Sequence, residues 1–222
     1  MDNSLDLALF SDFIPAYEKN FVLDTHRIIF YSSIEIKNSI TANTDEPVIS
    51  QQLTKKAKEF LASEIDWLGK RAEKYFASCE VPVMDDEDKL GKKSQKMDIV
   101  FEYSFNFIRR DYRPSFIFEA KRLKSKTHEM GAYLGKEGLQ RFIRGDYARN
   151  SSYAGMLGYV QTGDLKHWTD KLQTSFNEKY KDSKLTEIKV IEEICGEYTS
   201  IHKRRSNKQD VLIFHILLDF GK

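Results

Sequence analysis

Residues 115–121 constrain the fold of this chain most strongly, because charged and apolar side chains alternate in the second half of the segment. In a β-strand, successive side chains point to opposite faces of the sheet. Glu119 and Lys121 therefore share one face of a predicted strand, whereas Phe116 and Phe118 share the other. The segment predicts a strand with a carboxylate and an ammonium on one side and an apolar surface on the other.

A second strand is predicted at residues 97–105, and it carries Asp98 in a largely apolar run. The segment between the two strands contains Asp111 and Pro114, residue types that suit a turn. We expect the two strands to form an antiparallel pair. Such a pair would bring Asp98 close to Glu119.

The pattern of an aspartate, 20 intervening residues and then Glu-Ala-Lys resembles the active-site signature of the PD-(D/E)XK nuclease superfamily. Met97 stands where the name of the family has a proline. The resemblance covers roughly residues 50–220. It implies an α/β fold of the restriction-endonuclease-like kind, in which helices flank a mixed β-sheet.

The resemblance also implies roles for individual residues. Asp98, Glu119 and the main-chain carbonyl of Ala120 would hold Mg²⁺, with Mn²⁺ able to substitute, because a hard cation takes oxygen ligands. The metal would activate water, and Lys121 would orient the hydroxide or stabilise the scissile phosphate. Gln140, 19 residues after Lys121, resembles a catalytic glutamine on the helix that follows this strand in several families of the superfamily.

The tripeptide alone is not specific, because three other Glu-x-Lys sequences begin at Glu35, Glu87 and Glu187. Glu87 lies in an acidic run that is typical of a solvated loop, and too little chain follows Glu187 for the rest of the fold. Glu35 closes a strand-like segment at residues 27–37, but nothing before it predicts the helix that the fold requires. Only Glu119 has all the expected neighbours.

A helix is predicted between residues 50 and 78, where apolar residues recur with three-to-four spacing. Glu64 lies within this apolar stripe, between Leu61 and Leu68. An unpaired buried carboxylate is costly, so this position requires a cation or several hydrogen-bond donors. The family commonly places an additional metal-binding glutamate on this helix, and the resemblance assigns that role to Glu64. The alternative is a partly exposed glutamate at the edge of the stripe.

Basic residues are concentrated after the Glu-Ala-Lys strand, although the formal net charge of the chain is only +1. Residues 119–150 carry eight basic and four acidic side chains. A second basic run at residues 202–208 either contacts phosphates or forms a solvated hairpin loop. The side chains predicted to bind nucleic acid are Arg122, Lys124, Arg141, Arg144, His202 and Arg204.

The chain divides into a predicted extension and one predicted nuclease domain. Residues 1–49 form the acidic extension and are expected to contact a protein partner or a second copy of the chain. Residues 50–222 form the nuclease domain, in which residues 153–160 and 211–220 are expected to be further core strands. Residues 165–180 are expected to be helical.

Several other classes of protein are disfavoured. The longest apolar run, residues 211–218, is too short to span a bilayer, and the acidic amino terminus does not resemble a signal peptide. We therefore expect a cytoplasmic protein. Cys79 and Cys195 are isolated from each other, which disfavours a zinc knuckle and a disulfide framework. The five histidines lack the spacing of zinc ligands in a hydrolase, which disfavours a zinc hydrolase.

The sequence predicts a Mg²⁺-dependent deoxyribonuclease that hydrolyses phosphodiester bonds of DNA, and the resemblance extends to bacterial restriction and anti-phage defence nucleases. RNA stays open as a substrate. The alternative is a catalytically silent, nuclease-like subunit of a defence complex that binds DNA or a protein.

Overall fold

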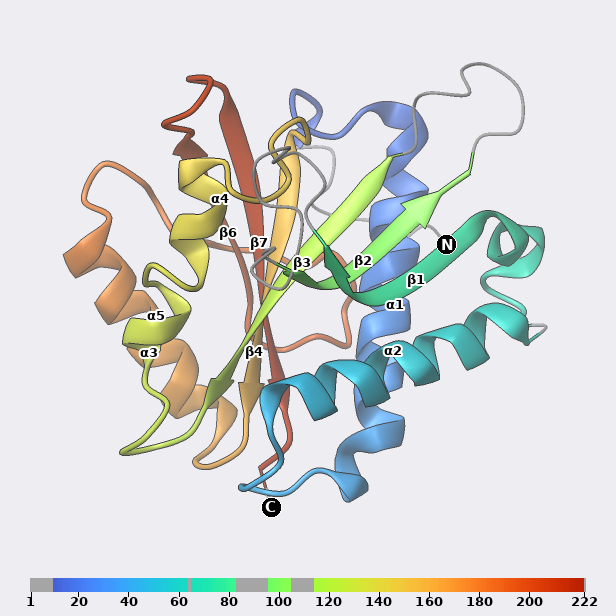
Figure 1. The fold of residues 1–222 in the computed structure, drawn as a ribbon, viewed down its shortest axis with the longest axis horizontal. Coiled ribbons are helices and arrows are strands. Elements are labelled where there is room, and N and C mark those ends of the chain that lie inside the picture. Colours follow the sequence, from blue (N-terminus) through green and yellow to red (C-terminus); the bar gives the residue numbers. More distant parts are fainter. Residues whose placement is uncertain (1–9, 64, 83–95, 105–113, 222) are drawn as a thin grey trace.

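A seven-stranded mixed sheet forms the centre of the chain (Figure 1). The computed structural model describes residues 10–63, 65–82, 96–104 and 114–221. The strand order is β1-β2-β3-β4-β7-β6-β5, in which β3, β4 and β7 run parallel and the other neighbours are antiparallel. The strands are β1 (Tyr75–Pro82), β2 (Lys96–Tyr103), β3 (Ser115–Leu123), β4 (Tyr153–Val160), β5 (Thr186–Glu187), β6 (Glu197–Lys203) and β7 (Asp210–Asp219).

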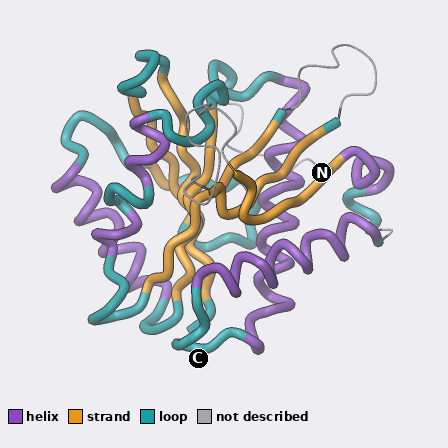
Figure 2. The backbone as a smooth tube through the Cα atoms, viewed as in Figure 1, coloured by secondary structure: helices purple, strands orange, loops and turns teal. Residues whose placement is uncertain are grey.

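Helices cover both faces of this sheet (Figure 2). Helices α1 (Lys19–Ile36) and α2 (Glu46–Ala62) pack on one face. On the other face lie α3 (Met130–Tyr133), α4 (Leu139–Arg144) and α5 (Leu165–Lys179). The predicted α/β class, with a mixed sheet flanked by helices, is confirmed. Three short 3₁₀ helices complete the described elements: Ala16–Glu18, Lys37–Ser39 and Gly69–Lys74.

The alternation of side chains along β3 is as predicted. Phe116 and Phe118 stack with their ring centroids 4.2 Å apart and join the core on the α1 side. Ile117 joins the core on the α5 side. The predicted antiparallel pair is also confirmed, because residues 99–102 of β2 pair with residues 115–118 of β3.

The strand predicted at residues 27–37 is instead the second half of α1. Its β-branched residues favour a strand in a short window, but a longer window contains a helical period. Val22, Ile29 and Ile36 are buried at seven-residue spacing, which places them on one face of a helix. Burial of that face against the sheet outweighs the weak preference of isoleucine for strands.

Helix α2 begins earlier and ends earlier than the predicted helix at residues 50–78. Asp45 precedes its first turn and Pro47 lies within that turn, where its missing N–H has no intrahelical partner to lose. The helix ends at Ala62, and Tyr75 already belongs to β1. The burial of Tyr75 therefore comes from the sheet and not from a continuing helical stripe.

The described part of the predicted extension packs into the same core as the sheet. Phe21, Val22 and Ile28 belong to one hydrophobic cluster with Phe116 and Phe118. The predicted boundary before residue 50 falls inside α2. Within the described ranges, no helix combines the length and apolar character needed to cross a membrane.

Candidate active site

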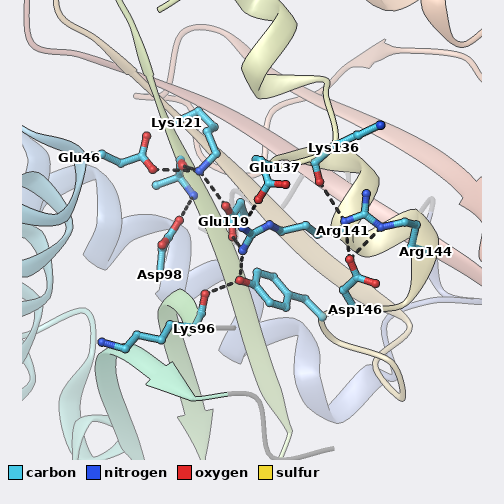
Figure 3. A network of polar contacts seen from close by, with 12 residues as sticks. Glu46, Lys96, Asp98, Glu119, Lys121, Lys136, Glu137, Arg141, Arg144 and Asp146 are labelled. Atoms are coloured by element: carbon cyan, nitrogen blue, oxygen red, sulfur yellow. Dashed lines mark hydrogen bonds and ion pairs between the residues drawn. The ribbon is translucent and has the colours of Figure 1, made fainter. Parts of the chain in front are cut away.

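The candidate site lies where β2 and β3 part (Figure 3). Beyond the Ile99–Phe118 pair, side chains replace the missing strand partner of β3. Asp98 Oδ2 accepts a hydrogen bond of 2.7 Å from the Ala120 amide, and Glu46 Oε2 accepts one of 3.0 Å from the Arg122 amide. Buried amides require acceptors, so the open edge of β3 itself holds both carboxylates in place.

The ammonium of Lys121 contacts several oxygen atoms of the site (Figure 3). Its Nζ atom lies 2.7 Å from Glu119 Oε1 and 2.9 Å from Glu46 Oε1. It also donates a hydrogen bond of 2.6 Å to the carbonyl of Ala120. The side chain of Glu119 is 1% exposed and that of Lys121 is 12% exposed. We refer to Glu46, Asp98, Glu119 and Lys121 as the Lys121 cluster.

Burial shifts the protonation of the cluster. It raises the pKa of Glu119 to about 8, with a further contribution from the charge of Asp98, whereas Lys121 and Arg141 oppose the shift. Burial also raises the pKa of Asp98. Lys121 is buried as well, but the surrounding carboxylates outweigh that effect and raise its pKa. The cluster therefore has a strong requirement for positive charge, either a proton or a cation.

The raised pKa of Glu119 predicts how stability depends on pH. The folded chain retains this proton up to about pH 8, whereas an unfolded glutamate loses it near pH 4.5. The folded state then binds more protons across this window, so its stability falls as the pH rises. We expect Glu119→Gln to reduce this fall in the free energy of unfolding, measured by denaturation in chelator at pH 5 and pH 8. The exposed Glu192→Gln is the matched control, and equal pH slopes in all three proteins would contradict the prediction.

Arg141 lies beside the Lys121 cluster (Figure 3). Its Nη1 atom is 3.6 Å from Glu119 Oε2, which has no hydrogen-bond partner among the described residues. The guanidinium lies 4.9 Å from the ring centre of Tyr147 and also contacts Glu137 and the Tyr147 hydroxyl. Tyr147 in turn donates a hydrogen bond to the carbonyl of Lys96. Arg141 is therefore placed to balance the charge of Glu119.

Gln140 does not join the cluster. It lines a cavity together with Tyr180. Neighbouring residues on a helix are rotated by about 100°, so α4 directs Gln140 and Arg141 to different sides. The catalytic role predicted for Gln140 therefore lacks structural support, and Arg141 is the residue of α4 that reaches Glu119.

Glu46 is the acidic residue that sequence reasoning missed. Glu64 lies outside the described residues, and α2 ends before it at Ala62. Glu46 lies at the opposite end of this helix, where it contacts Lys121 and the end of β3. Asp45 and Pro47 are residues typical of a helix start, and this signal could have moved the beginning of the predicted helix to Glu46.

Arg122 and Lys124 hold the chain segment before α2. Arg122 lies 3.0 Å from the carboxylate of Asp45 and donates a hydrogen bond to the carbonyl of Thr44. Lys124 donates a hydrogen bond of 2.9 Å to Asn43. These contacts help to position Glu46, and both side chains stay partly exposed.

Arg204 and His202 are both buried, which does not support the phosphate contacts predicted for their side chains. Arg204 is 1% exposed and donates hydrogen bonds to the carbonyls of Ala148 and Ser151. His202 is 4% exposed and lies within hydrogen-bond distance of Ser200. Arg144 is partly exposed and pairs with Asp146. Residues 204–209 form the turn of the β6–β7 hairpin, as the alternative reading of the basic run predicted.

The donor atoms of the cluster fit a hard divalent cation in kind, since they are carboxylate oxygens and one carbonyl oxygen. Among the described residues, no group of three or more His, Cys, Asp or Glu side chains is arranged to hold a metal ion. The oxygens of Glu46, Glu119 and Ala120 converge instead on the ammonium of Lys121. A metal ion at this position would have to displace that ammonium.

Comparison of the chain with models of protein families, with curated protein sequences and with solved structures gave no match.

Proposed function

We propose that this chain is a metal-dependent nuclease of the PD-(D/E)XK kind that hydrolyses phosphodiester bonds of DNA. The observation that carries the proposal is the convergence of Glu46, Glu119 and the Ala120 carbonyl on one cationic position, with Asp98 next to it. This position lies at the end of the strand that carries Glu-Ala-Lys. The side chains come from three separate elements, which a simple cross-strand ion pair would not require.

The order of the elements supports the same proposal. Helix α2 is followed by β1, β2 and β3, then by the short helices α3 and α4 and the parallel strand β4. The strand that carries Glu-Ala-Lys is thus the third strand after a helix, and helices and a parallel strand follow it. Asp98 and Glu119 lie on β2 and β3, and Glu46 lies on α2.

The residues of the cluster have separate tasks in this mechanism. Glu46, Asp98, Glu119 and the Ala120 carbonyl would hold Mg²⁺. When bound, the metal lowers the pKa of its water and neutralises charge on the scissile phosphate. Lys121, once it leaves the cation position, donates a hydrogen bond to a phosphate oxygen and stabilises the developing charge. Arg141 remains beside Glu119 and keeps that carboxylate oriented.

A metal-removal assay tests this function. We expect the purified chain to cleave double-stranded DNA with Mg²⁺ or Mn²⁺ and to lose all cleavage in excess EDTA, because no protein nucleophile has a role in the reaction. A parallel assay with RNA identifies the preferred nucleic acid. Cleavage that persists unchanged in excess EDTA would contradict the metal mechanism.

A second candidate is a catalytically silent subunit of a defence complex that binds DNA or a protein. One observation favours it, because the Lys121 ammonium fills the cation position and neutralises the carboxylates without a metal. In that case the chain would bind DNA equally in Mg²⁺ and EDTA and would cleave in neither. Whether the chain is an active nuclease or a silent subunit, the proposal includes a role in bacterial restriction or anti-phage defence and a cytoplasmic location. It also includes a protein partner or a second copy of the chain at residues 1–49.

A further inference from the structure

A cavity rich in basic residues lies on the other side of α4 from the Lys121 cluster. Its volume is about 270 Å³, and it is bounded by α4, the end of α5 with the turn that follows, and the end of β6. These elements lie together on the left side of the molecule in Figure 1. We call it the Lys203 pocket. Its lining includes the basic residues Arg144, Lys179, Lys181, Lys203 and Arg205.

The basic side chains of the pocket are poorly neutralised. Arg144 pairs with Asp146, but Lys181, Lys203 and Arg205 have no ion pair with any described residue. Among the described residues that line the pocket, Asp182 is the only acidic one. Like charges gathered around one cavity repel one another, so an anion in the pocket would stabilise this arrangement.

Several polar side chains that line the pocket are held in place by hydrogen bonds. Ser183 and His202 line it and lie 3.2 Å apart, Oγ to Nδ1. Tyr180 also lines it and is fixed by a hydrogen bond from its hydroxyl to the carbonyl of Leu134. The backbone of Arg205 is tied to α4 through the carbonyl of Ile143. The cations therefore surround a defined hollow and not a flat basic surface.

We propose that the Lys203 pocket is a binding site for a phosphate group, supplied either by a nucleotide or by the backbone of a nucleic-acid strand. Phosphate suits the pocket because ammonium and guanidinium groups make strong, charge-assisted hydrogen bonds to its oxygens. This site is distinct from the Lys121 cluster, since α4 separates Gln140 and Arg144 on the pocket side from Arg141 on the cluster side. The proposal stands whether or not the Lys121 cluster cleaves DNA.

The first test measures binding of inorganic pyrophosphate by calorimetry in EDTA, which removes metal binding at the cluster from the experiment. The variant Lys181→Glu/Lys203→Glu changes two exposed lysines of the pocket, and Lys55→Glu/Lys58→Glu makes the same charge change on α2. We expect the pocket variant to lose affinity by about tenfold or more, because two charge-assisted contacts disappear. The α2 variant should bind nearly as the wild-type chain does. Equal losses in the two variants, or no binding to the wild-type chain, would overturn the proposal.

Two further arms identify the source of the phosphate. Binding of ATP and of a single-stranded DNA oligonucleotide is compared in the same three proteins, again in EDTA. Loss of oligonucleotide binding in the pocket variant, with a salt dependence flattened by about 0.7 log units per lost contact, identifies a nucleic-acid backbone. Loss of ATP binding alone identifies a nucleotide site. Either result supports a phosphate site in the Lys203 pocket. If the pocket variant and the α2 variant both bound these ligands as tightly as the wild-type chain does, the proposal would be overturned.

A measurement on the wild-type chain covers the case in which the pocket variant does not fold. Lysines are acetylated with and without pyrophosphate, and the extent of labelling is read by mass spectrometry. We expect pyrophosphate to protect Lys181 and Lys203, while Lys55 and Lys58 label equally in both samples. Equal labelling of all four lysines with and without pyrophosphate would overturn the proposal.

Discussion

Glu119→Gln is expected to reduce Mg²⁺-dependent cleavage by about 10²-fold or more while the chain stays folded. Glutamine keeps the size of the side chain but removes the charge that would bind the metal, and loss of one preorganised electrostatic group has effects of this order. Removal of a buried carboxylate beside Asp98 also relieves repulsion between like charges. The rate is measured at saturating DNA over a titration of Mg²⁺, with circular dichroism as the measure of folding.

The control for this experiment is Glu178→Gln, an identical change at an exposed position of α5. Its cleavage rate should match that of the wild-type chain. If Glu119→Gln cleaved at the wild-type rate while folded, the Lys121 cluster would not be the active site.

Lys121→Met should separate metal binding from catalysis. The Lys121 ammonium lies within 2.9 Å of three oxygens that would ligate the metal, so metal and ammonium compete for one position. Without the ammonium, we expect Mn²⁺ to bind more tightly, as measured by calorimetry. Cleavage should nevertheless fall by about 10²-fold, because the group that stabilises the scissile phosphate is missing.

The exposed Lys136→Met serves as the control and should change neither quantity. Weaker Mn²⁺ binding in Lys121→Met would show that the ammonium supports the metal site instead of competing for it. Tighter binding with unchanged cleavage would remove Lys121 from the chemistry while leaving its competition with the metal intact.

Local pattern correctly predicted the antiparallel pairing of the strands that carry Asp98 and Glu119. Asp98 and Glu119 lie on adjacent strands whose apolar and polar faces alternate, and an antiparallel pair joined by a short segment can bring them together in few ways. The strands at residues 153–160 and 211–220 and the helix at residues 165–180 are likewise present, with ends that differ by at most one residue.

The errors concern features that depend on tertiary contacts. Glu46 is distant in sequence and reaches the site only because α2 packs across the sheet, where its first turn meets the open edge of β3. Residues 27–37 have the composition of a strand, but they form part of α1 because burial of one helical face outweighs that local preference. Arg204 is buried and donates hydrogen bonds to two main-chain carbonyls. The basic character of its side chain did not distinguish it from basic residues that stay exposed.

Anomalous diffraction from crystals soaked in Mn²⁺ tests the central claim most directly. We expect a manganese peak bonded to oxygens of Glu46, Asp98 and Glu119 and to the Ala120 carbonyl, with the Lys121 ammonium displaced from its present contacts. A map without manganese at this position, in which Lys121 still contacts both Glu46 and Glu119, would contradict the assignment of a metal-dependent active site.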